Sequence, residues 1–342
     1  MSFDNRGIII AGNIITDVVK TVDCYPQIGM LANISSVNRA VGGCVPNTAI
    51  DLKKIDDSIK VSAIGKIGND DSGEYILSQF KRFGILFDKV KRSQTKPTSF
   101  SDVISLPSGE RTFFHARGAN AEFSPKDIDL DTLNCDIFHI GYILLLDSMD
   151  KADNEYGTAM ARLLKSVQEK GIKTSIDVVS DSTADYKAKI VPALKYSNYA
   201  IMNEVESGML SDLSPYNADK SINTENIRKT MEAMAEYGVK DEIIIHCKDA
   251  GFCYDVQSQS FTAVASLNIP KEEILGSVGA GDAFCAGALY GIYNHFTDYE
   301  ILTFASAAAA CNLFCENSVD GMKSREEIYE IAKKYGRKED VL

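Results

Sequence analysis

The strongest constraint on the fold is a regular alternation of strand-like and helix-like segments from residue 124 onward. Apolar, β-branched runs at 136–143, 173–179 and 199–203 alternate with segments of helical periodicity, such as 224–237. Parallel strands need long crossover connections, and the helices that supply them cover both faces of the sheet. The sequence therefore predicts an α/β fold with a central, mostly parallel sheet and helices on both faces.

Two stretches early in the chain depart from this alternation. Residues 33–41 alternate without helical periodicity, and the strand-like segments 100–106 and 111–116 flank the turn sequence Pro107-Ser108-Gly109-Glu110, which is typical of a hairpin. We interpret these segments as one small β-sheet that projects from the main domain, as a lid over a cleft or as a dimer contact. The predicted division assigns 1–17, 42–96 and 118–342 to the α/β domain and 18–41 and 97–117 to the lid.

Composition excludes several classes of function. The hydrophobic share of 45% and charged share of 25% are ordinary for a globular protein with a sizeable core. A net charge of −12 argues against nucleic acid as a partner, because phosphate backbones require a basic surface. The chain has no apolar run of about 18 residues, so no membrane span is expected. Its eight cysteines form no C-x-x-C pair, which is typical of reduced thiols in a cytoplasmic protein.

The most informative local motif is Gly276–Gly291, which reads G-S-V-G-A-G-D-A-F-C-A-G-A-L-Y-G. Gly279, Ala280 and Gly281 precede an apolar helical run, so backbone N–H groups at a helix start could bind an anion there. Asp282 follows at once, and a carboxylate beside a phosphate makes sense if it takes a proton from an attacking group. The motif favours a phosphotransferase with Asp282 as its base, although a glycine-rich turn capped by Asp282 explains the local residues equally well.

Two other polar groups follow strand-like or glycine-rich segments. The run 7–17 predicts a buried strand that is broken by Gly12 and ends in the polar residues Asn13 and Asp17. An acid at the end of a central strand often contacts a ligand in open α/β sheets, but a solvated turn carboxylate is equally compatible. Further on, a pair of glycines opens a helix near Asn47, whose side chain can cap the helix or bind a hydroxylated ligand.

Three motifs occur together, in order: G-G-x-x-x-N-x-A early in the chain, N-x-x-E in the middle, and G-A-G-D at a late helix start. With them the chain resembles the ribokinase-like (PfkB) family of sugar kinases over about 7–335. The resemblance implies transfer of the γ-phosphoryl group of ATP to a hydroxymethyl group of a small sugar or sugar acid, with Mg²⁺. It assigns proton abstraction to Asp282 and the anion hole to Gly279, Ala280 and Gly281. The other implied residues are Asn13, Asp17, Gly43, Asn47 and Asn120 for the substrate, Asn203 and Glu206 for the metal, and Lys248, Gly251 and Ser306 for the nucleotide.

The chain also departs from the family pattern. Many relatives carry Asp-Thr, which helps to bind a monovalent cation, where this chain has Gly276-Ser277; this argues against activation by K⁺. The usual T-L-G-x-x-G loop appears as residues 246–251, in which Lys248 either reaches a phosphate or is a solvated charge. Arg111 and Arg117 could meet an acidic sugar, but solvated strand charges or interface residues are slightly favoured. His139 is interpreted as a packed strand residue, and its strand lacks the acid of ribokinase proper, which disfavours ribose.

Other functions remain open at this point. A nucleoside kinase of the same family would need an apolar slot for a base, which Phe100, Phe113 and Phe114 could supply. A non-catalytic sugar-binding or regulatory protein on the same scaffold would not need the acid at Asp282. A dehydrogenase is disfavoured because Phe284 occupies the third small position of a G-x-G-x-x-G fingerprint. The expected partners are a small sugar-like molecule and, through the lid, a second copy of the chain.

Overall fold

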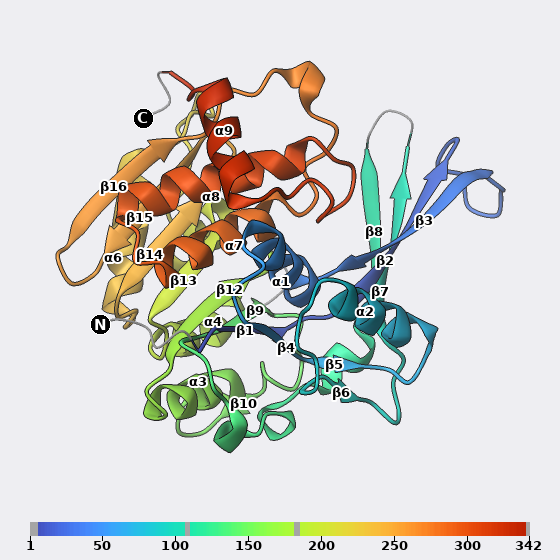
Figure 1. Cartoon of the computed structure of the whole chain (residues 1–342), viewed down its shortest axis with the longest axis horizontal. Helices are drawn as coiled ribbons and strands as arrows, with labels where there is room; N and C mark the ends of the chain where they lie inside the picture. Colours follow the sequence, from blue (N-terminus) through green and yellow to red (C-terminus); the bar gives the residue numbers. More distant parts are fainter. Residues whose placement is uncertain (1–5, 107–109, 181–184, 340–342) are drawn as a thin grey trace.

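The computed structural model describes residues 6–106, 110–180 and 185–339 (Figure 1). At its centre lies an eight-stranded sheet with the order β16-β15-β14-β13-β12-β9-β1-β4. From β4 to β14 all neighbours are parallel, and β15 and β16 add an antiparallel edge. The strands are β1 (Ile8–Gly12), β4 (Val61–Ile64), β9 (Ile137–Ile143), β12 (Lys173–Val178), β13 (Tyr199–Asn203), β14 (Glu242–His246), β15 (Ala250–Asp255) and β16 (Ser260–Ala265). The predicted α/β class is confirmed.

Helices cover both faces of this sheet and bury two separate apolar clusters. Ile8 and Ile10 of β1 point into the first cluster, whereas the alternate residues Ile9 and Ala11 point into the second. The first cluster is filled by α1 (Cys44–Ile55), α2 (Asp71–Arg82), α7 (Ala280–Tyr293), α8 (Asp298–Leu313) and α9 (Arg325–Tyr335). The second is filled by α3 (Ala159–Glu169), α4 (Tyr186–Leu194), α5 (Glu204–Ser211) and α6 (Thr224–Glu236).

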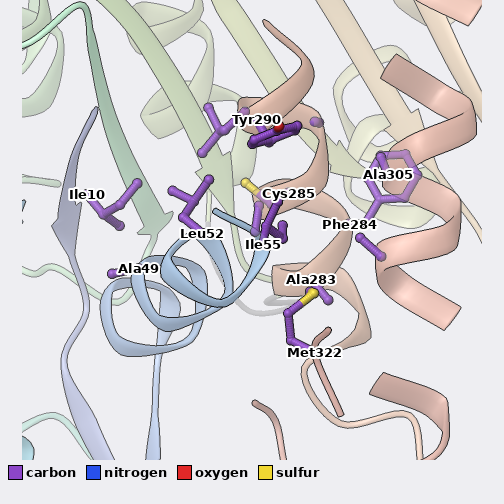
Figure 2. Packing of buried hydrophobic residues seen from close by; sticks show 14 of the residues in the cluster. Ile10, Ala49, Leu52, Ile55, Ala283, Phe284, Cys285, Tyr290, Ala305 and Met322 are labelled. Carbon is purple, nitrogen blue, oxygen red and sulfur yellow. The ribbon is translucent and has the colours of Figure 1, made fainter. Parts of the chain in front are cut away.

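Helices α1 and α7 pack directly against each other under the sheet (Figure 2). Leu52 and Ile55 of α1 lie beside Cys285 of α7, and Phe284 points toward α8. Both helices begin with glycine-rich segments, so this packing fixes the two starts relative to each other. The glycine motifs of the early and the late chain are thereby brought together.

A second, four-stranded sheet projects from the main body (right in Figure 1). Its order is β3-β2-β7-β8, with β2 (Ile15–Val22), β3 (Ile34–Gly42), β7 (Ser99–Ser105) and β8 (Arg111–Ala116). We call these four strands the small sheet. It matches the predicted strand-rich stretches. Strand β2 starts directly after β1, so the chain passes from the central sheet into the small sheet within a few residues. Of the predicted hairpin turn, residues 107–109 lie outside the described residues.

Short elements connect the main strands. Helix α3 starts at Ala159, because a small hairpin precedes it and the Thr158 hydroxyl accepts the N–H of Ala161 at 3.1 Å. Ser124-Pro125 opens a single 3₁₀ turn. The remaining elements are β5 (Lys66–Ile67), β6 (Lys91–Arg92), β10 (Ala152–Asp153), β11 (Gly157–Thr158) and the 3₁₀ turns Gly118–Glu122, Pro125–Asp127, Leu130–Thr132 and Lys271–Glu273. Within the described ranges, the helices are all too short or too polar to cross a membrane.

Candidate active site

The start of α7 has the geometry of an anion site. Gly279 caps the helix with φ of 78°, and a Cβ placed on it would lie 2.5 Å from the carbonyl oxygen of Ser318, so the position requires glycine. Ala280 donates its N–H to the Ser277 carbonyl at 3.2 Å. Among the described residues, the next two amides, those of Gly281 and Asp282, have no carbonyl partner. The N–H of Gly279 likewise has no carbonyl partner in this part of the chain, so of the predicted anion hole only the Ala280 amide is already paired.

The Asp282 carboxylate lies in the first turn of α7 and is held by two neutral donors. Asn47 of α1 donates its Nδ2 to Oδ2 at 2.8 Å, and the Tyr142 hydroxyl donates to both oxygens at 3.1 Å. Ser318 fixes the amide of Asn47 by donating to its Oδ1 at 2.9 Å. Burial raises the pKa of Asp282, while the hydrogen bonds from Asn47 and Tyr142 oppose that rise. An oriented carboxylate with an increased proton affinity suits a general base.

Asn13 and Gly43 form a polar corner beside this base. Asn13 is completely buried, and neither its amide oxygen nor its amide nitrogen has a hydrogen-bond partner in the described part of the chain. Gly43 has φ of 84°, and a Cβ on it would lie 2.5 Å from the Asn13 Oδ1. An unpaired buried amide costs free energy unless something binds it. This corner therefore has unused hydrogen-bonding capacity for a polar ligand.

Asp17 lies on β2 and faces the same site. Burial, followed by the charge of Asp282, raises its pKa to about 7. A Cβ on Gly42 would come within 2.3 Å of the Asp17 Oδ2, so the small residue on β3 makes room for this carboxylate. The predicted site residues thus come from the link between β1 and β2 (Asn13), from β2 (Asp17), from α1 and its cap (Asn47 and Gly43) and from α7 (Asp282).

Asn120, which the resemblance placed near the substrate, has its side chain already paired. Its Oδ1 accepts the N–H of Ile14 and its Nδ2 donates to the Ile14 carbonyl, both at 3.1 Å. The amide thus mimics a β-strand partner at the point where β1 passes into β2. In this structure both polar atoms of the Asn120 side chain bind the Ile14 backbone, and its role in binding the substrate stays a prediction.

The small sheet presents one row of polar side chains to Asp17. Asp17 pairs with Ser101 of β7, and Ser101 pairs with His115 of β8, so all three side chains lie on the same face. The Ser101 hydroxyl and the His115 Nδ1 are 3.0 Å apart. Burial, with the charge of Arg117 second, lowers the pKa of His115, which keeps its ring neutral near pH 7.

The two arginines proposed for an acidic ligand differ in their surroundings. Arg111 lies on the same face of β8 as His115, and both of its terminal nitrogens contact the Glu316 carbonyl at 3.4 Å. Arg117 donates Nη1 to the Leu144 carbonyl and to Asp147, each at 2.7 Å. Arg117 is therefore paired with an acid, whereas Arg111 faces the Asp17 side with only weak contacts to a carbonyl group.

The three phenylalanines proposed as a base slot do not converge. Phe113 shares the face of Asp17, since it pairs with Val103 of β7. Phe100 and Phe114 occupy the alternate positions of β7 and β8 and so lie on the opposite face. The aromatic slot of a nucleoside kinase is therefore not formed by this set.

A cavity of about 190 Å³ lies on the other side of Asp282. Asn203 and Glu206 line it and form a capping box at the start of α5, in which Asn203 accepts the Glu206 N–H at 2.8 Å and Glu206 accepts the Asn203 N–H at 2.9 Å. Burial raises the pKa of Glu206 to about 7. Asp177, at the end of β12, also lines the cavity, and its pKa is raised by burial and by Glu206 and Asp282.

The sequence reasoning missed Asp177, although its position carried a usable signal. It is an acid near the carboxyl end of a predicted parallel strand. Asp17 was expected at the end of such a strand, but the predicted run 7–17 is divided into β1 and β2, and Asp17 lies inside β2 of the small sheet. No cluster of three or more His, Cys, Asp or Glu side chains in the described residues could hold a metal ion. The carboxylates of Asp177 and Glu206 are nevertheless hard oxygen ligands, which suit Mg²⁺ that keeps several waters and binds phosphate oxygens.

A larger cavity of about 810 Å³ opens beyond the ends of β14 and β16, against α7 and α8. Lys248 and Ser306 line it, and the Ser306 hydroxyl donates to the Leu302 carbonyl at 2.7 Å. Gly251 does not line the cavity; a Cβ there would lie 3.3 Å from Leu302 and from Phe284, so this glycine allows close packing behind the wall. The volume is in the range of a site for a nucleotide-sized ligand. The two cavities share His246 and Gly281.

The fold and this site are those of a sugar kinase of the ribokinase type, and comparisons with known proteins agree. The family model described as "pfkB family carbohydrate kinase" matches residues 6–325. The chain therefore belongs to the pfkB family of carbohydrate kinases. The curated 5-dehydro-2-deoxygluconokinase of Clostridium perfringens is 23% identical over 310 residues, which cover 89% of this chain and 87% of the relative.

Solved structures show the same fold. The ribokinase of Arabidopsis thaliana complexed with ribose and ATP has a TM-score of 0.79 at 18% identity, covering 97% of this chain and 99% of the other. A putative ribokinase II of E. coli in complex with ATP and Mg²⁺ has a TM-score of 0.74 at 17% identity, covering 98% and 100%. The predicted ribokinase-like architecture, with its extra small sheet, is confirmed.

Proposed function

We propose that the protein transfers the γ-phosphoryl group of ATP to a hydroxymethyl group of a small sugar acid. The observation that carries this proposal is the position of Gly281 and Asp282. Gly281 lines both the nucleotide-sized cavity and the acidic cavity, and Asp282 lines the acidic cavity and lies close enough to Asp17 for its charge to raise the pKa of that residue. A phosphoryl group leaving the larger cavity would meet an acceptor beside the carboxylate.

The residues divide the chemistry as follows. Asp282 takes the proton of the acceptor hydroxyl as its oxygen attacks, and the free amides of Gly281 and Asp282 bind the oxygens of the migrating group. Asn13, Asp17 and Gly43 hold the acceptor in a fixed position. Asp177 and Glu206 would hold hydrated Mg²⁺ beside the phosphates, and that ion would neutralise phosphate charge. Lys248 and the wall around Ser306 serve the nucleotide.

An acidic substrate is supported by two findings. The Clostridium perfringens relative is named for 5-dehydro-2-deoxygluconate, a sugar acid. In this chain Arg111 lies on the Asp17 face of the small sheet, with only carbonyl contacts at 3.4 Å. A guanidinium in that state can pair with a substrate carboxylate. We therefore assign substrate charge recognition to Arg111 rather than Arg117.

The test is a panel of sugars, sugar acids and nucleosides, assayed for ADP release with Mg²⁺. A sugar acid should be the best acceptor. Arg111→Ala should raise its KM at least tenfold while kcat and the KM for ATP change less than threefold, and Arg228→Ala, an exposed helix arginine, should change neither. A neutral sugar or nucleoside as the best acceptor would overturn the sugar-acid assignment but not the kinase activity.

Activity should be equal in K⁺ and in N-methylglucamine buffers, since Gly276 lacks a carboxylate.

We also propose that the small sheet acts as a lid and as the contact of a homodimer, in a cytoplasmic protein. Its strand β3 is an open edge with exposed apolar residues, which would pair or be covered in an oligomer. The exposed apolar side chains on β3 are Ile34 and Val37, and the loop between β2 and β3 adds Tyr25, Ile28, Met30 and Leu31. Light scattering should give twice the mass of the chain, and Val37→Lys should halve it. A wild-type monomer would contradict the dimer.

A further inference from the structure

The side chain of His246 stands at the boundary between the two cavities and has no role in the scheme above. His246 ends β14, where it pairs in parallel register with Asn203 at the end of β13. Its ring lines the nucleotide-sized cavity on one side and the acidic cavity on the other. It packs on the ring of Phe284, with centroids 4.7 Å apart and planes 32° apart. Packing against a fixed aromatic ring limits the orientations that the imidazole can adopt.

The imidazole also faces the anion hole. A Cβ built on Gly281 would lie at van der Waals distance from the ring of His246, 3.5 Å from Cε1 and 3.9 Å from Nε2, so the imidazole lies beside this glycine. Among the described residues, the N–H of Gly281 is one of the amides at the start of α7 that have no carbonyl partner. Because the ring and the Gly281 backbone are neighbours, we expect an anion bound to that amide to lie within reach of the imidazole.

Within the described residues, both ring nitrogens of His246 are without a side-chain hydrogen bond. The side-chain hydrogen bonds formed by the described residues do not include Nδ1 or Nε2 of His246, in contrast to His139, whose Nδ1 lies 3.0 Å from the Ser175 hydroxyl. Burial lowers the pKa of His246 to about 4, so the ring is neutral at pH 7 and carries one N–H donor. A neutral donor can bind a phosphate oxygen without forming an ion pair with the nearby acids Asp177 and Glu206.

We infer that His246 is a catalytic residue whose N–H binds an oxygen of the phosphoryl group as it crosses from the larger cavity toward Asp282. This inference rests on the proposed kinase function. The imidazole works with the Gly281 amide: the amide and the ring donate to the same group from two sides, and no bond to His246 forms or breaks. Removal of one such preorganised donor typically lowers kcat by about 10²–10³-fold. The alternative is that the ring only fills space between Phe284 and the cavities.

Two substitutions separate these roles, because each keeps one property of the imidazole, its ring or its N–H donor, and removes the other. His246→Phe keeps an aromatic ring on Phe284 but loses the N–H. His246→Gln loses the ring but keeps an N–H near the position of Nε2. Titration calorimetry with ADP and with the β,γ-imido analogue of ATP, both with Mg²⁺, reports contact with the γ-phosphoryl group without need of a sugar. Phe284→Leu is the matched control for packing.

We expect His246→Phe to weaken binding of the imido analogue about tenfold, with ADP affinity changed less than threefold, and His246→Gln to bind the analogue nearly as well as the wild type. In turnover with the best acceptor, kcat should fall about 10²-fold in the phenylalanine variant and less in the glutamine variant, while Phe284→Leu should affect both nucleotides equally. The inference is overturned if the phenylalanine variant outperforms the glutamine variant, or if ADP and the analogue lose affinity together. If the wild type binds the analogue but phosphorylates no acceptor, the proposed function fails, whereas the calorimetry still decides the contact of His246.

Discussion

Asn47 and Asp282, which are 235 residues apart in the chain, share a hydrogen bond of 2.8 Å between Nδ2 and Oδ2. The bond joins the first turns of α1 and α7, both of which follow glycines with positive φ. Because the two helices pack along their lengths, the amide sets the direction of the carboxylate. The two glycine motifs look independent in the sequence, but together they fix the orientation of the Asp282 carboxylate.

Replacing the base should separate activity from stability. Asp282→Asn keeps the shape of the side chain and can still accept from Asn47, but it cannot take a proton. We expect kcat to fall by at least 10²–10⁴-fold. The melting temperature should equal or exceed that of the wild type, because the substitution removes the free-energy cost of burying a carboxylate whose pKa is raised. Asp88→Asn, at an exposed carboxylate, is the control. Normal turnover in Asp282→Asn would show that the base is another group.

Tyr142→Phe should change the pH dependence of catalysis. The hydroxyl donates to both Asp282 oxygens at 3.1 Å and so lowers the pKa of that carboxylate. Its loss should raise the pKa, and since the base must be ionised, the acid limb of the kcat/KM profile should move to higher pH. Tyr329→Phe, on the half-exposed side of α9, should leave the profile unchanged. A shift of the limb to lower pH would contradict the proposed hydrogen bond.

The requirement for glycine at Gly279, at the start of α7, can be tested against Gly171, which lies elsewhere and serves as the control. Both have positive φ, 78° and 74°, but a Cβ on Gly279 would lie 2.5 Å from the Ser318 oxygen, whereas none of the described atoms lies within 4 Å of a Cβ on Gly171. Gly171→Ala should lower the free energy of unfolding only by the cost of holding alanine in the left-handed conformation, roughly 1–2 kcal/mol. Gly279→Ala should cost more and should abolish turnover by displacing the anion hole. Urea unfolding and ADP release measure the two effects, and equal costs would refute the crowding argument.

Glu242, which lies outside the candidate active site, should make the free energy of unfolding depend on pH. Burial, with Asp298 and Asp255 nearby, raises its pKa to about 8, so the native state holds a proton that the unfolded state loses near pH 4.5. Stability contributed by this group is therefore lost as the pH rises from about 4.5 to 8. Glu242→Gln should melt higher than the wild type at pH 8.5, with little difference at pH 4.5 and unchanged kcat. A variant that is less stable at pH 8.5 would contradict the assigned pKa.

Much of the fold could be predicted because it follows from local periodicity. Helix α7 begins at Ala280 and ends at Tyr293, as its apolar run and glycine start indicate, and β13 likewise has its predicted bounds. Helix α5 was not predicted, since Glu204–Ser211 is short and weakly amphipathic and is fixed mainly by its capping box. Local patterns therefore fail where tertiary contacts and caps define the element.

The site was only partly accessible to sequence reasoning, for a similar reason. The contact between Asn47 and Asp282 depends on the packing of two helices, and the shared face of Asp17 and His115 depends on strand register across three strands. Tyr142 was missed because it reaches the base only through a left-handed backbone, with φ of 60°. Such a conformation is rare for tyrosine, and it leaves no periodic signal in the sequence.

The direct passage from β1 into β2 has a consequence for the design of inhibitors. The small sheet is joined to the central sheet at this point by Asn13 and Ile14 alone, and Asn120 holds Ile14 on both sides. Under the lid function proposed above, a compound bound to the amide of Asn13 would occupy the junction between the two sheets. It would thereby restrict the closure of the small sheet, which a competitor confined to the larger cavity would not affect.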